Sequence, residues 1–490
     1  MIYNSFTKSM PNFLQNYCNF VAIMNREILR IAIPNIISNI TVPLMGIVST
    51  AIASRACGGA GSEAIGALSI GVTIFNFIYW NCSFIRMGTS GLTAQAFGAE
   101  NHREYSLMLW RSLIVALGVG ILAFALQYPI GEFSMWFMDT GSEESRSMIA
   151  SYFYTRIWAV PAGILLFAFN GWFTGMQNAV VPMVVAILVN IIHIGCSYLF
   201  SIVGVDMLTS STDVIETTCV LCGNTTSTMG LKGIALASVV AQWTGVLVMV
   251  AIILLRYRKR LVKVNMKEVM DFSSMRRFFS INSDIIIRTF CLVAVYTFFT
   301  KASADTGDDN ILAVNTILLQ LFTLFSYMND GFAYAAEALT GRFIGARDGV
   351  SLRRSIKLCL IWCFAVSFIF IGVYIGWWRN IFTLIANPEL GDINVLLSVA
   401  EEYIGWIIAI PLAAAMPFVM DGIMVGATRS RIMRNSMIWS SVCFFVILYG
   451  LGWLIGNNAL WLAFTMYMFL RGVFQYFMSD RLRDIYRQAN

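Results

Sequence analysis

The sequence predicts an all-α polytopic membrane protein with twelve transmembrane helices in two pseudo-symmetric six-helix lobes. Hydrophobic residues make up 58% of the 490 residues and charged residues only 12%, whereas a soluble domain carries roughly 25% charged residues. Apolar runs long enough to cross a bilayer recur from residue 28 almost to the end. Inside a bilayer only helices or a closed barrel satisfy the backbone. These runs are far longer than the ~10-residue strands of a barrel, so we expect helices.

Twelve segments fit this architecture in chain order. The predicted spans are 28–54, 64–97, 106–130, 148–176, 181–204, 231–256, 278–300, 310–341, 355–377, 396–426, 432–455 and 458–479. Several exceed the thickness of a bilayer and should tilt or project beyond it. The predicted organisation is an N-terminal tail (1–25), an N-lobe (26–256), a cytoplasmic basic linker (257–277), a C-lobe (278–479) and a cytoplasmic C-terminal tail (480–490). A start of translation at Met1 or at Met24 is left open.

Charge divides the loops between the spans into two alternating sets. One set is rich in lysine and arginine, above all the segment 256–277, and the other carries acidic residues with few basic ones. The positive-inside rule places the basic loops in the cytoplasm. Both termini are then cytoplasmic, which agrees with an even number of spans, and we expect the protein in the cell (inner or plasma) membrane. The net charge of +6 thus does not indicate nucleic-acid binding.

A weak internal repeat relates the two halves. "GLTAQAFGAEN" (91–101) resembles "EALTGRFIGARD" (337–348), and each ends a long span and enters a basic loop. "GWFTGMQNAVVPM" (171–183) resembles "DGIMVGATRSRIM" (421–433), and each joins the fourth and fifth spans of its half. Two halves with the same orientation imply a parallel repeat about an axis normal to the membrane. That arrangement makes a cavity between the lobes, which suits alternating access.

Several segments resemble, in their amino-acid sequences and in their order along the chain, the multidrug and toxic-compound extrusion (MATE) family, specifically its DinF-like branch. The segments are "REILRIAIPNIISNITVPLMGIVSTAIA", "GALSIGVTIFNFIYWNCSFIRMGTSGLTAQAFGA", "GWFTGMQNAVVP", "NSDIIIRTFCL", "DGFAYAAEALTGRFIGARD" and "DGIMVGATRSRIMRNSM". The resemblance implies the MATE fold, with two six-helix lobes arranged as a V. It also implies a secondary active exporter of small organic compounds, an antiporter coupled to inward flow of H⁺ or Na⁺.

The resemblance also implies an ion pocket in the N-lobe, and this sequence departs from it. In the DinF-like branch an Asp of the first span and an Asn and an Asp of the fifth span typically line the pocket, with a hydroxyl from the sixth. Here the first-span acid reads Ser49, and the fifth-span pair reads His193 and Ser197. The hydroxyl survives as Ser238. Asn190, His193 and Ser197 are spaced three and four residues apart, so they share one helix face.

Three roles remain open for His193. Serine cannot titrate, whereas histidine titrates at about 6.5 and can replace a carboxylate as a proton carrier. The ring is either such a carrier, a substrate contact, or a neutral ring hydrogen-bonded to Ser197 or Ser49. Na⁺ favours carboxylate oxygens over hydroxyls alone, so we expect coupling to an H⁺ gradient rather than to a Na⁺ gradient.

Arg86 and Arg156 match family positions in spans of the N-lobe. Either they line the cavity near the span ends, with their charges reaching water, or they bind substrate. With both acids missing, the N-lobe carries basic side chains and no deep carboxylate of its own. An anionic or neutral substrate then suits it better than a lipophilic cation. An alternative function is a flippase-like transporter of a lipid-linked or anionic amphiphilic substrate.

The C-lobe supplies further candidates for coupling. Asp330 and Glu337 are seven residues apart on the eighth span and share one face. We expect Glu337 to be the better replacement for the missing coupling acids. In the first span, Pro34 and Pro43 each remove a helix hydrogen bond and permit a kink. Pro34 occupies a position that matches the family, where bending of the first helix is tied to the N-lobe cavity, so a hinge is predicted.

Three other charged residues of the C-lobe are expected to form structural ion pairs. Asp284 and Arg288 have the i, i+4 spacing that allows pairing within the seventh span. Asp421 lies near the cytoplasmic end of the tenth span. We expect it to hold the following turn and to pair with Arg429 or Arg434.

The remaining features exclude other classes of function or leave them weakly supported. No HExxH, nucleophile elbow or paired acidic motif indicates a membrane enzyme, and no Cys/His spacing predicts a metal or other cofactor. A degenerate, non-pumping sensor is supported only by the lost acids. Cys219 and Cys222 form a small disulfide in an oxidising compartment or stay free thiols. We expect a monomer that binds a small organic substrate and membrane lipid, and no nucleic acid.

Overall fold

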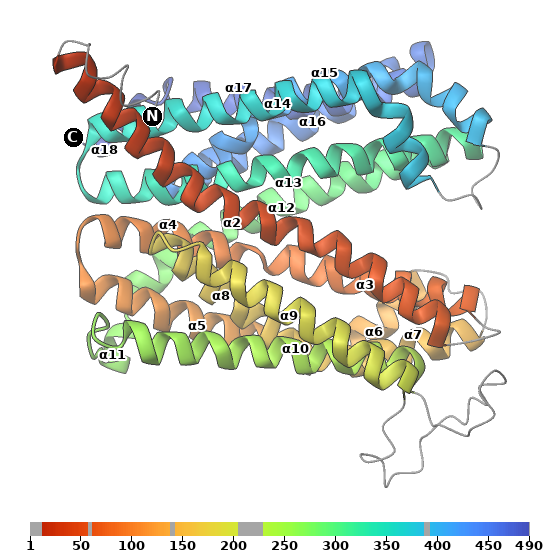
Figure 1. The fold of residues 1–490 in the computed structure, drawn as a ribbon, viewed down its shortest axis with the longest axis horizontal. Helices are drawn as coiled ribbons and strands as arrows, with labels where there is room; N and C mark the ends of the chain where they lie inside the picture. Colours follow the sequence, from red (N-terminus) through yellow and green to blue (C-terminus); the bar gives the residue numbers. More distant parts are fainter. Residues whose placement is uncertain (1–11, 57–60, 138–142, 204–228, 387–392, 490) are drawn as a thin grey trace, which may run out of the picture.

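Helices make up nearly all of the computed structural model, which describes residues 12–56, 61–137, 143–203, 229–386 and 393–489 (Figure 1). The N-terminal half contains α2 (Asn12–Ala56), α3 (Gly61–Cys82), α4 (Phe84–Gly98), α5 (His102–Ala125), α6 (Gln127–Phe137), α7 (Glu143–Arg156), the 3₁₀ turn η2 (Ile157–Ala159), α8 (Val160–Gly175), α9 (Val180–Tyr198), the π-helical turn η3 (Leu199–Val203), α10 (Gly230–Ile252) and the π-helical turn η4 (Ile253–Tyr257). The short α11 (Met266–Val269) follows. The C-terminal half contains α12 (Phe272–Ala304), α13 (Asp309–Gly345), α14 (Gly349–Ile385), α15 (Ile393–Gly426), α16 (Ser430–Ile455), α17 (Asn457–Met478) and α18 (Arg483–Gln488).

The long helices form two lobes that lie side by side, with α3–α10 in one and α13–α17 in the other (Figure 1). Eleven segments of the described chain are long and apolar enough to cross a membrane. The twelfth predicted span is α17, which falls short in hydropathy because it contains Arg471 and Gln475. It still packs along α15 and α16 and completes the second lobe. The start of α2 and the short α18 lie at the same end of the molecule (Figure 1).

The internal repeat is visible in the backbone. Glu100 and Arg347, each the second-last residue of its copy of the first repeated segment, have φ angles of 53° and 55°. Gln177 and Thr428, in the copies of the second, have φ angles of 60° and 54°. Left-handed φ values are uncommon outside glycine. Their recurrence at matching places shows that the two halves use the same turns to join the same helices.

The first helix, α2, contacts both lobes. Its amino-terminal part packs on the C-terminal lobe, where Glu27 meets Arg342 at 3.3 Å and Asn39 donates to the carbonyl of Tyr327 at 3.3 Å. Its later part packs against α3 and α9 of the N-terminal lobe. In between, α2 crosses diagonally from one lobe to the other (Figure 1).

Both prolines of α2 lie inside the continuous helix. Pro34 is buried in the part that packs on α13, whereas Pro43 is exposed just beyond the last hydrogen bond to that helix, from Asn39. Pro43 therefore stands where α2 passes between the lobes, with one backbone hydrogen bond fewer. A hinge at either proline stays a prediction.

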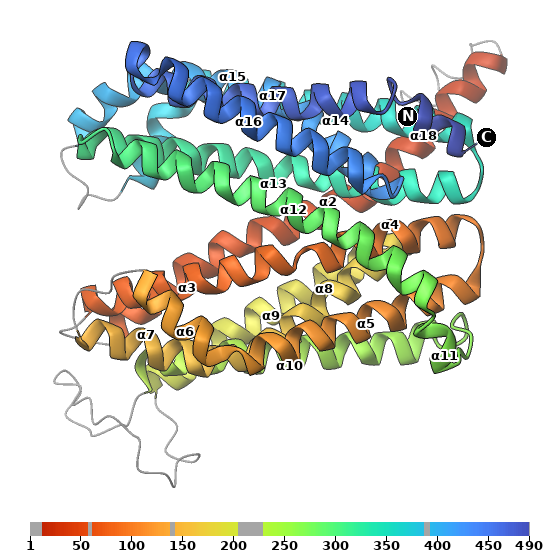
Figure 2. The ribbon, with the colours of Figure 1, turned by 180° about the vertical axis from the view of Figure 1, so that it is seen from behind.

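The first helix of the second half, α12, is also shared between the lobes. Phe278, near its start, packs with Leu92 and Met108 of the N-terminal lobe. Phe299, near its end, packs against Trp461 and other aromatic rings of α17, with ring centroids 5.0 Å apart. Figure 2 shows α12 crossing between the lobes from behind, as α2 does in front. Any change in the angle between the lobes must therefore bend or tilt these two helices.

The lobes touch where the two copies of the first repeated segment meet. A side chain at Gly98 would collide with the carbonyl of Arg342, and one at Gly345 with the carbonyl of Gln95. These two glycines let α4 and α13 approach through their backbones. The amide of Gln95 also donates to the carbonyl of Gly426 at 2.9 Å. This contact lies at the end with the basic loops, and the ribbons diverge toward the opposite end (Figure 2).

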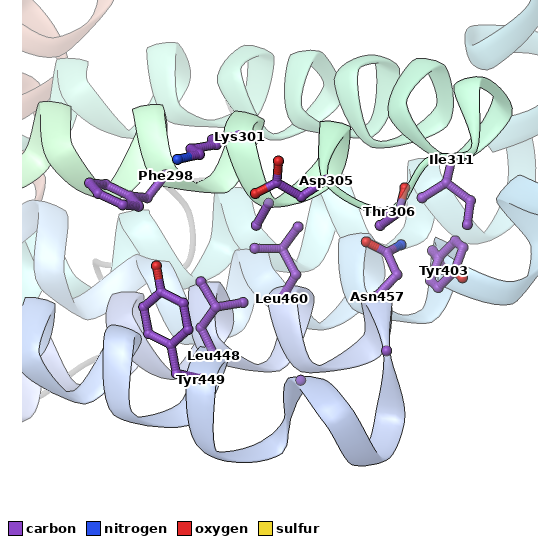
Figure 3. Close-up of a pocket in the computed structure, with 13 residues that line it drawn as sticks. Phe298, Lys301, Asp305, Thr306, Ile311, Tyr403, Leu448, Tyr449, Asn457 and Leu460 are labelled. Carbon is purple, nitrogen blue, oxygen red and sulfur yellow. The ribbon is translucent and has the colours of Figure 1, made fainter.

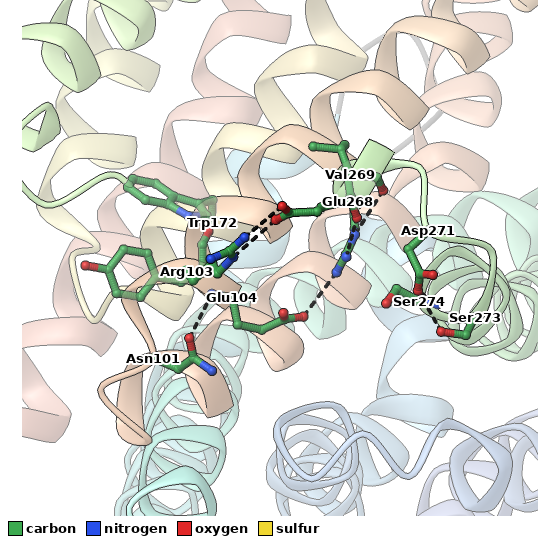
Figure 4. Close-up of polar contacts among 11 residues, drawn as sticks. Asn101, Arg103, Glu104, Trp172, Glu268, Val269, Asp271, Ser273 and Ser274 are labelled. Carbon is green, nitrogen blue, oxygen red and sulfur yellow. Dashed lines mark hydrogen bonds and ion pairs between the residues drawn. The ribbon is translucent and has the colours of Figure 1, made fainter. Parts of the chain in front are cut away.

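The segment between the halves is held against the N-terminal lobe (Figure 4). Arg111 of α5, 2% exposed, donates to the carbonyls of Glu268 and Val269 at 2.9 and 3.1 Å. Arg103 forms a two-point ion pair with Glu268. Asp271 then caps α12, and hydrogen bonds from Ser273 and Ser274 lower its pKa to about 2. The cap is therefore ionised throughout the physiological pH range.

Two terminal segments differ from the predicted tails. α2 begins at Asn12, so half of the expected N-terminal tail is helical; no glycine or proline interrupts the chain between residues 12 and 33. At the other end, α18 buries Ile485 completely, and the guanidinium of Arg353 lies 4.8 Å from the ring of Tyr486. The C-terminal segment is therefore packed on α14.

Two further features complete the comparison with the predicted spans. The span predicted at 64–97 is broken at Ser83, whose hydroxyl donates to the carbonyl of Trp80 at 2.7 Å. That side-chain hydrogen bond satisfies a carbonyl where α3 passes into α4. Cys219 and Cys222 lie outside the described residues.

Replacing Gly98 with valine should open the contact between the lobes. The added side chain has no room beside the backbone of Arg342, so α4 must move away from α13. We expect amide hydrogen exchange in residues 95–102 and 342–349 to rise by roughly tenfold or more. Gly118→Val is the matched control, because nothing lies within 4 Å of that position. Equal exchange in both variants would show that the glycine contact does not hold the lobes together.

Candidate functional site

The N-terminal lobe places His193 in a small buried hydrogen-bond network. His193 is 5% exposed, and its Nε2 lies 3.0 Å from the hydroxyl of Ser238 on α10. Ser238 donates its own hydrogen to the carbonyl of Ile234 at 3.2 Å. The hydroxyl therefore accepts from Nε2–H, so the network places a hydrogen on Nε2. Nδ1 has no hydrogen-bond partner.

The other predicted residues of this group lie on the same helix as His193 or on α2. Ser197, one turn further along α9, is fully buried and its hydroxyl has no partner, while Asn190 is half-buried. Ser49 is buried on α2. Of the three roles left open for His193, the hydrogen bond to Ser197 or Ser49 is not formed, because the ring pairs with Ser238 on the adjoining helix.

Arg156 occupies an aromatic cage beside this network. Its guanidinium carbon lies 4.8 Å from the ring centre of Phe75 and 5.4 Å from that of Tyr152. Nη1 donates to the hydroxyl of Tyr152, and Nε is buried without a partner. Arg156 is 8% exposed and close enough to act electrostatically on His193. A positive charge here opposes a second one on the ring.

Arg86 does not extend this basic cluster. It points to the other lobe, where it forms an ion pair with Glu337 of α13 at 3.6 Å. Its guanidinium lies 4.3 Å from the ring centre of Tyr334. Glu337 is 2% exposed, and its second carboxylate oxygen has no hydrogen-bond partner. The partner of Arg86 is thus an acid of the C-terminal lobe, and the buried acids of the described chain all lie in that half.

Asp330 lies two turns before Glu337 on the same face of α13. It is half-buried, and within the described part of the chain it makes no hydrogen bond or ion pair at contact distance. Its carboxylate interacts electrostatically with Arg86, Arg288 and Arg471. Asp330 is thus a carboxylate that three arginines attract but that forms no ion pair with any of them in the described chain.

The predicted structural ion pairs exist, but with different partners. Asp284 binds Arg434 at 2.6 Å and accepts from Ser430 at 2.8 Å, both on α16. Arg288 instead binds Asp421 of α15. Pairing within α12 is therefore wrong: pairing between helices gives each of the two buried carboxylates an arginine and a further hydrogen bond, from Ser430 to Asp284 and from Gln475 to Asp421.

Asp421 has partners that differ from the expected Arg429 and Arg434. It is 6% exposed and binds Arg471 of α17 at 3.0 Å as well as Arg288. Gln475, one turn further along α17, donates to its other oxygen. The carboxylate of Asp421 on α15 therefore links α12 and α17 to its own helix.

Buried charge is distributed unequally between the lobes. In the described chain the buried carboxylates all belong to the C-terminal half, and each has an arginine partner. Arg111 and Arg471, both buried, also have a carboxylate partner. Arg156 is the exception, since no carboxylate or carbonyl of the described residues lies within bonding distance of it. An unpaired buried charge costs several kcal/mol.

A separate cavity of about 510 Å³ lies within the C-terminal lobe at the end opposite the basic loops (Figure 3). Phe298, Lys301 and Asp305 of α12 line one side, and Tyr449 and Asn457 line the other. The cavity contains none of the residues predicted from sequence. The predicted site is thus a set of buried polar groups distributed between the lobes rather than this cavity.

The sequence matches a family model in both halves. The MatE model covers residues 34–199 and 286–454. DNA damage-inducible protein F of Escherichia coli K12 is 31% identical over 455 residues, which are 93% of this chain and 92% of that protein. The chain belongs to the MatE (MATE) family. The expected family is confirmed, and its members are membrane transporters rather than enzymes.

More distant relatives agree with this assignment. Protein DETOXIFICATION 45, chloroplastic, of Arabidopsis thaliana is 22% identical and covers 92% of this chain and 77% of its own length. The probable multidrug resistance protein NorM of Thermotoga maritima is 21% identical, over 66% and 64% of the two chains.

Solved MATE structures share the fold. An outward-facing multidrug resistance MATE transporter of the MOP superfamily has a TM-score of 0.79 at 15% identity, over 94% of this chain and 96% of that chain. A MOP superfamily transporter from Pyrococcus furiosus has a TM-score of 0.78 at 15% identity, over 95% and 97% of the chains. The all-α fold with two six-helix lobes is confirmed.

The sequence analysis of this MATE chain did not identify three residues that surround or pair with its buried charges. Arg471 stands inside an apolar span, which is itself a signal of a paired or functional group. Phe75 and Tyr152 have no such signal, because aromatic residues in a membrane helix are ordinary core or interface residues. Their role becomes visible only where α3 and α7 pack together around Arg156.

Removing the carboxylate of Asp421 should destabilise the C-terminal lobe. Asp421→Asn leaves Arg288 and Arg471 buried without a countercharge, and breaking such a buried pair costs about 3–5 kcal/mol. Glu401→Gln is the control, because its pair with Arg379 is exposed and such pairs contribute about 0–1 kcal/mol. Unfolding of the purified variants in one detergent measures both. Similar losses in the two variants would contradict this assignment.

Proposed function

We propose that this MATE protein is a secondary active exporter of small organic compounds, driven by inward flow of protons. The observation that carries the proposal is the ion pair between Arg86 and Glu337, which joins the two lobes. Alternating access requires the lobes to separate at the end where they now touch, and that separation breaks this pair. Its strength therefore sets the cost of changing conformation.

Protonation of Glu337 links this cost to the proton gradient. While Glu337 is ionised, separating the lobes breaks the attraction between its buried carboxylate and the partly buried guanidinium of Arg86. A proton on Glu337 removes the attraction and lowers that cost. A proton taken up from outside thus promotes opening toward the cytoplasm, where the proton leaves and substrate binds. Asp330, which also acts on Arg86, is a second group able to hold the proton.

His193 is less suited to carry the proton. Its Nδ1 faces no hydrogen-bond acceptor that would hold a second ring hydrogen, and the charge of Arg156 disfavours a second positive charge beside it. Within the described residues no carboxylate contacts the ring to compensate for protonation. Na⁺ coupling through this pocket has even less support, because its residues offer hydroxyl and ring nitrogen atoms and no carboxylate.

The distribution of charge also supports an orientation. The lobes touch at the end that carries the basic loops, and the positive-inside rule places that end in the cytoplasm. The structure then corresponds to a state closed to the cytoplasm, as does the outward-facing relative of similar fold. We assign the protein to the cell membrane as a monomer, with both termini in the cytoplasm.

Transport in proteoliposomes tests the coupling. Vesicles are loaded with either the anion 2-naphthalenesulfonate or the cation ethidium, so that the result does not depend on substrate charge. We expect an imposed pH gradient, and not a Na⁺ gradient at equal pH, to drive movement of one of these compounds. Glu337→Gln should lower the gradient-driven rate by about tenfold or more, because the titrating group is gone.

Glu132→Gln is the matched control, because that side chain is exposed and far along the chain from the lobe contact. It should keep the rate of the parent protein. The variant His193→Gln distinguishes between His193 and Glu337 as the residue that carries the proton. Loss of pH-driven transport in His193→Gln, together with normal transport in Glu337→Gln, would show that the proposal names the wrong group.

A further inference from the structure

We infer that the free edge of the Arg156 guanidinium is a binding site for an organic oxyanion, a carboxylate, sulfonate or phosphate carried on an apolar body. This inference rests on the proposed function, because it names the substrate class of the same transporter. Arg156 takes no part in the proposed proton step, which uses Glu337 and Asp330.

The guanidinium of Arg156 is satisfied on only one side. Nη1 donates to Tyr152, whereas Nε is buried without a partner, and no hydrogen bond is formed by Nη2 among the described residues. The Nε–Nη2 edge of a guanidinium presents two parallel N–H groups, which match the two oxygens of an oxyanion. The open edge is therefore the one suited to bidentate binding.

Aromatic rings restrict how a ligand can approach. Phe75 and Tyr152 lie over the guanidinium at 4.8 and 5.4 Å, and Phe75 also packs against Tyr79, with ring centres 6.5 Å apart. Ring contacts stabilise the cation without neutralising it. A ligand must therefore enter in the plane of the guanidinium. An apolar body attached to the oxyanion would then lie beside these rings.

The described N-terminal lobe offers Arg156 no carboxylate as a countercharge. Every other buried arginine of the described chain has a carboxylate partner, from Glu104 for Arg111 and from Asp421 for Arg471. All buried carboxylates of the described chain lie in the C-terminal half. Thus no acidic side chain of the described N-terminal lobe competes for Arg156, and a bound anion would supply the missing countercharge.

The neighbouring polar groups also disfavour a cation. His193 presents an unpartnered Nδ1, Ser197 an unpartnered hydroxyl, and Ser49 replaces the first-span acid that the family resemblance implies. A lipophilic cation in this pocket would meet Arg156 without a carboxylate to offset the repulsion. The selectivity for charge is therefore set mainly by Arg156.

Binding of two matched probes tests the inference without any transport step. The purified protein in phosphatidylcholine nanodiscs is titrated with 2-naphthalenesulfonate and with 2-naphthyltrimethylammonium, which share the aromatic body and differ in charge. We expect the sulfonate to bind at least about tenfold tighter than the ammonium compound and Arg156→Gln to remove this preference. Arg156→Lys should give an intermediate affinity, because it keeps the charge and loses the bidentate edge.

Arg146→Gln is the matched control, because Arg146 lies on the same helix but is exposed and paired with Glu132; it should bind like the parent. Thermal unfolding of the parent protein provides a measurement that needs no variant, since the sulfonate should raise the unfolding temperature and the ammonium compound should not. Equal or tighter binding of the ammonium compound, or an affinity for the sulfonate within about twofold of the parent in Arg156→Gln, overturns the inference.

Lipid composition distinguishes the two sources of such an anion. Competition between phosphatidylglycerol in the nanodisc and 2-naphthalenesulfonate supports a lipid headgroup as the occupant, and with it a flippase-like function. Absence of competition supports a soluble organic anion. Both results keep the oxyanion site. Because no gradient is used, a failure of pH-driven transport would leave this test intact, and its own failure would leave proton coupling untouched.

Discussion

Two charges of opposite sign, the partly buried Arg86 on α4 and the buried Glu337 on α13, meet where the lobes touch. Their contact is possible because Gly98 and Gly345 let the same two helices approach through their backbones. The glycines supply fit and the ion pair supplies a group that can titrate. Together they define one closed arrangement of the lobes and provide a contact that protonation can weaken. A transporter that opens in each cycle requires both.

The two lobes share a fold but handle charge differently. In the C-terminal lobe, Asp284 and Asp421 tie helices together through arginines that come from other helices. In the N-terminal lobe, Arg156 is left with aromatic rings and one hydroxyl. The two lobes therefore share one fold, and their buried charges differ. We propose that this difference serves two tasks, proton binding on one side and oxyanion binding on the other.

The sequence predicted the helical fold, the internal repeat and the family because each depends on local pattern: apolar length, charge in loops and short motifs. It also identified His193, Glu337 and Arg156 as residues of interest. It could not predict their partners. The i, i+4 spacing of Asp284 and Arg288 suggested a pair within one helix, whereas Asp284 pairs with Arg434 of α16 and Arg288 with Asp421 of α15. Such contacts depend on how helices far apart in the chain are placed.

The central claim, that protonation of Glu337 releases the closed end of the lobes, is tested most directly by the distance between them. Spin labels on the α4–α5 and α13–α14 turns, measured by electron–electron resonance in nanodiscs, report that distance. We predict a shift toward longer distances in the parent protein at acidic pH, and in Glu337→Gln long distances at every pH. A distance distribution that is the same at acidic and alkaline pH in the parent protein would contradict the claim.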